Sequence, residues 1–189
     1  GCAPCQPFSR YSSRYRKEGH TDNKWRLLYS FERLVRETLP DIVSMENVPN
    51  LIHENVFRDF VRTLNELHYE VEYQVVNCPD YGVPQHRKRL VLLASRFGEI
   101  HLIPPLYDAE HYITVRDAIG HLQPIEAGEI CPDDILHRSS ALSAINMERI
   151  QQSVPGGTWR DWDENLRLKC HRKESGATFP SVYGRMEWD

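Results

Sequence analysis

The stretch EVEYQVVNCPDYGVPQHRKRLVLLAS, residues 70–95, decides the fold of the first part of this 189-residue chain. Its opening, EVEYQVVNC at 70–78, is rich in valine and tyrosine and predicts a strand, and LVLLAS at 90–95 predicts a second strand. Glycine and proline in YGVPQHRKR, residues 81–89, predict a turn or loop between them. Because no helix separates these two strands, antiparallel pairing stands beside the parallel pairing of an ordinary βαβ sheet.

Upstream of this stretch, two predicted helices flank a short predicted strand. Each helix has an apolar stripe with a spacing of 3.6 residues. The stripes consist of Leu28, Phe31, Leu34, Val35 and Leu39, and of Val56, Phe57, Phe60, Val61, Leu64 and Leu67. Between them, residues 41–49 predict a buried strand that stops at Pro49. Strands alternating with helices over short connections predict an α/β sheet, and ligand chemistry in such sheets gathers at the carboxyl ends of strands.

The composition changes from about Pro124. Proline, glycine, histidine and arginine become more frequent there, and the apolar periodicity weakens. We therefore expect a boundary within residues 120–126, with a first domain at 1–123 and a smaller, irregular domain at 124–189.

The overall composition is that of a soluble globular protein, with 40% hydrophobic and 26% charged residues and a net charge of −4. No apolar run is long enough to span a membrane, and no signal-peptide pattern is present. The five cysteines are odd in number and scattered, which favours a reducing compartment over a disulfide framework. No Gly-x-Gly occurs, so neither a dinucleotide fingerprint nor a P-loop is present in this chain.

The chain opens with GCAPCQPFS, in which proline neighbours stiffen the backbone around Cys5. Three interpretations compete for Cys2 and Cys5: a redox Cys-x-x-Cys pair, half of a metal site, or a nucleophile on a loop. A zinc site needs about two further ligands at matching spacing. The pair Cys170–His171 lacks the Cys-x-x-Cys repeat, so we expect no metal site.

Four motifs in a fixed order point to one family. They are Pro-Cys-Gln at 4–6, Glu-Asn-Val at 46–48, Gln-x-Arg-x-Arg at 85–89 and the closing SVYGRMEWD at 181–189. Together they make the chain resemble the DNA (cytosine-5) methyltransferases, and the resemblance covers essentially its whole length. By the same resemblance, residues 142–162 and the closing motif belong to the target-recognition region of bacterial members.

The resemblance implies an S-adenosylmethionine-dependent, Rossmann-like methyltransferase sheet that lacks its first strands. It assigns the nucleophile to Cys5, whose thiolate adds to C6 of cytosine and activates C5 for methylation. Glu46 faces N3 of the ring, and Arg87 or Arg89 favours the thiolate. The implied substrate contacts are Ala3, Pro4, Gln6, Ser9, Arg10, Arg14, Asn47 and Gln85. The implied contacts to the methyl donor are Pro4 and Leu27.

The implied partner is double-stranded DNA. A cytosine inside a duplex cannot present C6 to a side chain, so the base must be flipped out. Basic residues then need only line one cleft, with the cluster at 167–173 on the phosphates, and the second domain reads base edges. We expect a bacterial, cytoplasmic, nucleoid-associated enzyme of a restriction–modification system.

The family holds S-adenosylmethionine mainly through a Phe-x-Gly-x-Gly turn and acidic residues ahead of the catalytic loop, which this chain does not contain. We therefore expect the isolated chain to be inactive until flanking segments or a complementary methylase subunit complete it. A non-enzymatic DNA-binding remnant and a subunit of a split methylase are the alternatives. A tRNA methyltransferase is a third, but that branch carries Cys-Phe-Thr, whereas Cys131 precedes Pro132 and Cys170 precedes His171.

Overall fold

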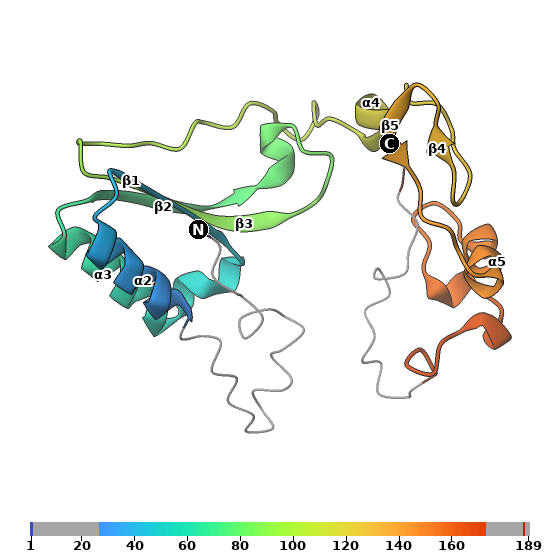
Figure 1. The fold of residues 1–189 in the computed structure, drawn as a ribbon, viewed down its shortest axis with the longest axis horizontal. Coiled ribbons are helices and arrows are strands. Elements are labelled where there is room, and N and C mark those ends of the chain that lie inside the picture. The colour runs from blue at the N-terminus through green and yellow to red at the C-terminus, as the bar shows by residue number, and fades with distance from the viewer. Residues whose placement is uncertain (2–26, 173–186, 188–189) are drawn as a thin grey trace. The chain divides into compact units, whose positions relative to one another are not determined.

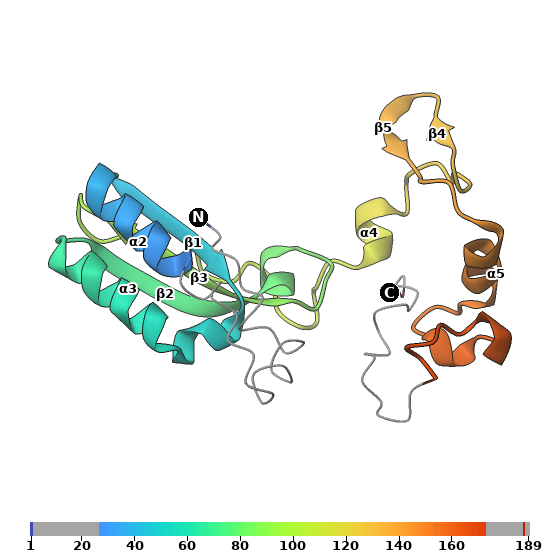
Figure 2. The same cartoon turned by 60° about the horizontal axis from the view of Figure 1, so that its bottom comes forward.

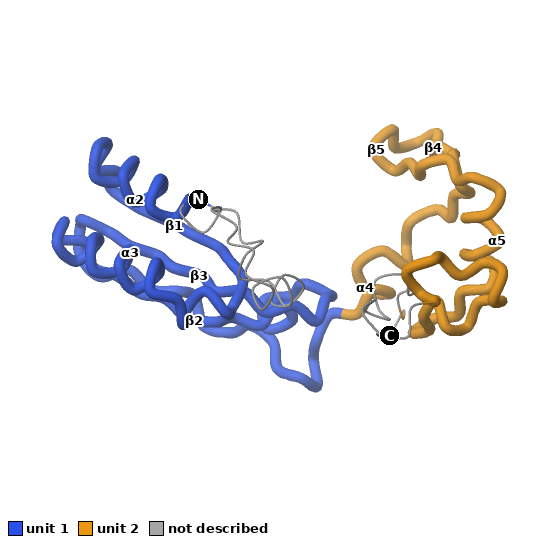
Figure 3. The backbone as a smooth tube through the Cα atoms, turned by 90° about the horizontal axis from the view of Figure 1, so that it is seen from below, with its two compact units in different colours: residues 1–113 blue, residues 114–189 orange. Residues whose placement is uncertain are grey.

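A computed structural model of the chain describes residue 1, residues 27–172 and residue 187. The chain divides into two compact units, residues 1–113 and residues 114–189 (Figure 3). The change of composition at Pro124 therefore lies inside the second unit. Residues 96–113 belong to the first unit. The backbone amide of Leu102, for example, donates a hydrogen bond to the side chain of Glu72 in the first unit.

The first unit contains every helix and strand that the sequence predicts before residue 96. Their bounds are α2 (Leu27–Thr38), β1 (Ile42–Asn47), α3 (Asn55–Glu66), β2 (Glu70–Asn77) and β3 (Lys88–Ser95). Two short 3-10 helices, η3 (Pro49–His53) and η4 (Cys78–Tyr81), follow β1 and β2.

The three strands form a sheet in the order β1-β3-β2, and β3 is antiparallel to both neighbours. This confirms the antiparallel alternative for the last two strands. Since β1 and β2 both run opposite to β3, they run in the same direction, and α3 forms the crossover between them. Helices α2 and α3 lie side by side on one face of the sheet (Figures 1 and 2). The expected partial α/β sheet is therefore present.

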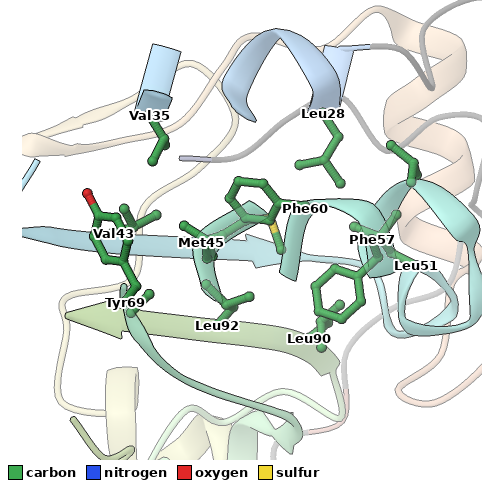
Figure 4. Packing of buried hydrophobic residues seen from close by; sticks show 13 residues of the cluster. Leu28, Val35, Val43, Met45, Leu51, Phe57, Phe60, Tyr69, Leu90 and Leu92 are labelled. Atoms are coloured by element: carbon green, nitrogen blue, oxygen red, sulfur yellow. The ribbon is translucent and has the colours of Figure 1, made fainter. Parts of the chain in front are cut away.

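The core of the first unit lies between this sheet and the two helices (Figure 4). Leu90, Leu92 and Ala94 alternate along β3 and are fully buried on the helical face. They meet buried side chains of β1, the helices, η3 and the residue before β2, which are Leu28, Val35, Val43, Met45, Leu51, Val56, Phe57, Phe60, Leu64 and Tyr69. Burial of these apolar groups stabilises the packing of α2 and α3 on the sheet.

The second unit is small and irregular. It contains α4 (Val115–Ile119), an antiparallel pair of short strands, β4 (Ile130–Cys131) and β5 (Asp134–Arg138), and α5 (Ala144–Gln152). Two 3-10 turns, η5 (Trp159–Asp161) and η6 (Glu164–Leu166), follow. None of the described helices in either unit has the length and apolar character that a membrane span requires.

A layer of aromatic rings forms the core of the second unit. The rings of Trp159 and His171 stack with centroids 4.5 Å apart and planes 8° apart, and Trp162 packs against His171 at 5.9 Å. Nδ1 of His171 accepts a hydrogen bond from the backbone amide of Leu168 at 3.2 Å. With only 7% of its surface exposed, His171 is a buried histidine in an aromatic setting.

The stability of this layer should depend on pH through His171. Burial, and then the charges of Arg149 and Arg167, lower the pKa of His171 below its ordinary value. The unfolded chain therefore binds the proton more readily, so stability is fully present above about pH 6.5 and is lost as pH falls below it. Thermal unfolding followed by tryptophan fluorescence should show the melting temperature of the second unit falling between pH 7.5 and pH 5.

His171→Phe keeps a ring in the stack and removes the titrating group, so its melting temperature should change less over this range. His121→Gln is the matched control, because His121 is exposed in the same unit. Equal pH slopes in the wild type and in His171→Phe would contradict this account.

Candidate active site

Glu46 and Arg89 meet on the face of the sheet opposite the helices. Met45 and Asn47 of β1 point into the core, so Glu46 between them points the other way, as Arg89 does beside Leu90 of β3. The Nε of Arg89 lies 2.5 Å from Oε1 of Glu46, and Nη1 of Arg89 donates to the carbonyl of Lys88 at 2.8 Å. The guanidinium therefore holds the carboxylate in one place at the end of β1.

Gly1 pairs with the outer edge of β1 at the same end. Its nitrogen donates to the carbonyl of Ser44, and its carbonyl accepts from the amide of Glu46 at 3.1 Å. Gly1 thus bonds to the two residues that flank Met45, which is the hydrogen-bond pattern of a parallel strand pair. The carbonyl of Gly1 therefore lies beside the backbone of Glu46.

Gln85 and Arg87 lie on the exposed loop that leads into β3. The loop is closed at its base, because the amide of Cys78 donates to the carbonyl of Arg87 at 2.7 Å. The side chain of Arg87 forms no ion pair with any described carboxylate. Its charge is therefore available at the same end of the sheet as Glu46 and Arg89.

Two other residues expected in the site occupy different settings. Asn47 is 2% exposed on the helical face of β1, where its Oδ1 accepts a hydrogen bond from the amide of Val48 at 2.9 Å. This bond shapes the strand end next to Glu46. Leu27 is the first residue of α2 and is 40% exposed.

The remaining expected site residues lie outside the described part of the chain. They are Ala3, Pro4, Cys5, Gln6, Ser9, Arg10 and Arg14. Cys2 lies outside it as well. The structure therefore brings Glu46 and Arg89 together and leaves the position of the expected nucleophile as a prediction.

The described residues contain no group of three or more His, Cys, Asp or Glu side chains arranged to hold a metal ion. Of the Cys170–His171 pair, His171 is part of the aromatic layer, because its imidazole stacks on Trp159, whereas Cys170 is exposed.

Four arginines surround the aromatic layer of the second unit, an arrangement that the sequence motifs do not predict. The guanidinium groups of Arg160 and Arg167 lie over Trp159, at 5.4 and 5.9 Å, and that of Arg149 lies over Trp162 at 5.8 Å. The side chains of Arg149, Arg167 and Arg172 donate to backbone carbonyls at 2.7 to 3.1 Å. None of the four forms an ion pair with a described carboxylate, so no carboxylate in the described part of the chain neutralises their positive charge.

Comparison with known proteins identifies the family. Residues 1–185 match the C-5 cytosine-specific DNA methylase family. The chain belongs to this family. It is 53% identical over 192 residues to the type II methylase M.HgiDII of Herpetosiphon aurantiacus, covering all of this chain and 53% of the relative. It is 33% identical over 176 residues to the type II methyltransferase M1.HphI of Haemophilus parahaemolyticus, covering 88% of this chain and 45% of the relative.

The chain thus spans about half the length of these curated members of the methylase family. A solved structure from E. coli, described as a DNA modification methyltransferase encoded within a prophage, matches 71% of this chain with 25% identity and a TM-score of 0.52. The match covers 37% of that structure. The α/β architecture of the first unit is therefore that of a partial methyltransferase sheet.

The ion pair of Glu46 should contribute little to folding. Glu46 is 45% exposed, and pairs near the surface contribute at most about 1 kcal/mol. Arg89→Gln should therefore lower the free energy of unfolding by no more than about 1 kcal/mol, measured by urea denaturation. The matched control is Arg33→Gln, which removes the exposed pair between Arg33 and Glu37 (2.8 Å) from α2.

A loss of about 3 kcal/mol or more in Arg89→Gln alone would mean that the pair is a buried structural one and would contradict this reading.

Proposed function

We propose that the chain carries the cytosine-binding and target-recognition parts of a DNA (cytosine-5) methyltransferase of a type II restriction–modification system. The observation that carries the proposal is the meeting of Gly1, Glu46 and Arg89 at one end of the sheet. Membership of the methylase family, and the names of the two bacterial type II relatives, support the choice of reaction and of biological setting.

Cys5 is the proposed nucleophile. Only four peptide bonds separate it from Gly1, whose carbonyl bonds to the amide of Glu46. Four residues of chain span at most about 14 Å, so this tether keeps Cys5 within reach of the Glu46 end of β1. The charge of Arg87 at this end favours the thiolate form of a nearby cysteine, whereas Glu46 offsets much of the charge of Arg89.

The proposed chemistry is a covalent addition followed by an elimination. The Cys5 thiolate forms a bond to C6 of a flipped cytosine while Glu46, in its protonated form, donates a proton to N3. The C5 carbon thereby becomes nucleophilic and accepts the methyl group. Loss of the C5 proton to a base then re-forms the C5–C6 double bond and expels the thiolate, and N3 returns its proton to Glu46. Arg89 keeps the carboxyl group of Glu46 aimed at the ring.

S-adenosylmethionine supplies the methyl group when it is bound. Among the described residues, Leu27 is the proposed contact, since it is exposed at the start of α2. Pro4 is the second proposed contact. Because the chain spans about half of its relatives, we propose that other segments, in the same chain or in a complementary subunit, complete the donor site. The 189 residues alone should then transfer no methyl group at a useful rate.

Double-stranded DNA is the proposed substrate, acted on in a bacterial cytoplasm at the nucleoid. The arginines around Trp159 and Trp162 suit phosphate groups, because guanidinium binds phosphate oxygens in a bidentate manner. The rest of the second unit would then read base edges in the major groove.

Covalent trapping tests the proposed chemistry. In the presence of S-adenosylmethionine, duplex DNA carrying 5-fluorocytosine at the target position should trap the full-length enzyme, since after methylation fluorine cannot leave C5 as a proton does. Cys5→Ser should abolish trapping, because a serine hydroxyl is a poor nucleophile at neutral pH. Arg89→Gln should slow trapping by about 100-fold or more through loss of Glu46 orientation, well beyond its effect on stability. The adduct is measured as a band shift on a denaturing gel.

Cys2→Ser is the matched control and should trap as the wild type does. Equal loss of trapping in Cys2→Ser and Cys5→Ser would favour a Cys-x-x-Cys redox or metal pair and would refute the methyltransferase mechanism for this chain.

A further inference from the structure

The turn that follows β2 carries a half-buried carboxylate with two hydrogen-bond donors. Oδ1 of Asp80, in η4, accepts from the hydroxyl of Tyr112 at 2.6 Å and from Nδ2 of Asn77 at 2.8 Å. The Tyr112 hydroxyl also lies 3.2 Å from the Asn77 amide, so the three side chains form a closed triangle. Asn77 ends β2, whereas Tyr112 is the second-last residue of the first unit.

The backbone of Asp80 binds the same distant segment. Its carbonyl accepts from the amides of Leu106 at 2.8 Å and Tyr107 at 3.1 Å. The ring of Tyr107 packs over Gly82, where a Cβ atom would lie 3.1 Å from the ring and where φ is +80°. Residues 106–112 are therefore fastened onto η4 at several points, and Asp80 supplies most of them.

The loop with Gln85 and Arg87 is attached to this fastened turn at both ends. Its beginning is held by the amide of Val83, which donates to the carbonyl of Cys78 at 3.3 Å. Its end is held by the amide of Cys78, which donates to the carbonyl of Arg87 at 2.7 Å. The chain then enters β3, where Arg89 contacts Glu46. A displacement of η4 would therefore displace Arg87 and alter the approach to Arg89.

The hydrogen bonds around Asp80 persist across the neutral pH range. The donors Tyr112 and then Asn77 lower the pKa of Asp80, and the same contact with Asp80 raises the pKa of Tyr112. The carboxylate therefore stays ionised and the phenol stays protonated, so the contact acts as a fixed support.

We propose that Asn77, Asp80 and Tyr112 form a latch that positions the Gln85–Arg89 loop for reaction with the cytosine. The latch residues are positioning residues, since they act through Arg87 and Arg89 without touching the base. The inference rests on the proposed function, in which these arginines serve the Cys5 addition. Tyr112 is the residue that ties the loop to the end of the first unit.

The test variant is Tyr112→Phe, which removes one hydroxyl group and keeps the ring. Its matched control is Tyr29→Phe, because the Tyr29 hydroxyl donates to Asp59 Oδ2 at the same distance of 2.6 Å, between α2 and α3. Both tyrosine–aspartate pairs are half-buried, and both lower the pKa of the aspartate. Each substitution therefore removes one tyrosine–aspartate hydrogen bond, in the latch and in the helical layer respectively.

The first readout is single-turnover trapping of the full-length enzyme on 5-fluorocytosine duplex DNA in the presence of S-adenosylmethionine. The trapping rate constant reports positioning, whereas the amplitude reports the folded fraction. Tyr112→Phe should lower the rate constant at least about tenfold with its amplitude retained, since misplaced groups near a reacting centre slow the reaction. Tyr29→Phe should keep the wild-type rate constant. In an Arg87→Gln background, Tyr112→Phe should have a smaller effect, because both changes act on one group.

The second readout is amide hydrogen exchange, which does not depend on activity. Exchange at Cys78, Val83 and Gln85 should be faster in Tyr112→Phe and unchanged in Tyr29→Phe. Wild-type exchange in Tyr112→Phe, or wild-type trapping rates with only the amplitude lowered, would overturn the latch. Absence of trapping in the wild-type enzyme would refute the proposed function, and the exchange experiment would still decide whether the latch holds the loop.

Discussion

Strand β3 is the element on which the first unit depends, because it makes every strand pairing of the described three-stranded sheet. β1 and β2 both pair with β3, one on each side, and α3 connects β1 to β2. Its alternate residues serve opposite sides, with Leu90 and Leu92 buried against the helices and Arg89 on the other face. A register slip of one residue would turn Leu90 outward and Arg89 into the core, so core burial fixes the register and, with it, the site.

The antiparallel direction of β3 explains why Glu46 and Arg89 meet although they are distant in sequence. In an antiparallel pair the end of one strand lies beside the start of the other. β1 ends just after Glu46, and β3 begins just before Arg89. Gly1 joins this end through its parallel pairing with β1. The loop that carries Arg87 therefore opens at the same end, and its position depends on how the turn after β2 is held.

Periodicity predicts the helices and strands before residue 96, because apolar side chains repeat with the spacing of each element. Val43, Met45 and Asn47 alternate along one strand, and this spacing predicts that Asn47 faces the core. The family resemblance alone does not predict this orientation. Contacts such as Asp80 with Tyr112 and Trp159 with His171 escape prediction, since they join residues of irregular segments without a periodic pattern. The sequence alone did not decide the direction of β3, because a connection without a helix is compatible with both parallel and antiparallel pairing of β2 and β3.

The distribution of charge reconciles a net charge of −4 with a proposed DNA substrate. In the first unit, Arg33, Arg36 and Arg89 lie next to carboxylates, which cancel much of their field. In the second unit, Arg149, Arg160, Arg167 and Arg172 are oriented by backbone carbonyls and indole rings, which leave the full charge in place. Salt screens charges beyond about 8 Å, so a phosphate responds to the nearest groups and hardly to the distant acidic residues. We therefore expect local pairing, more than total charge, to decide where the proposed DNA substrate contacts this chain.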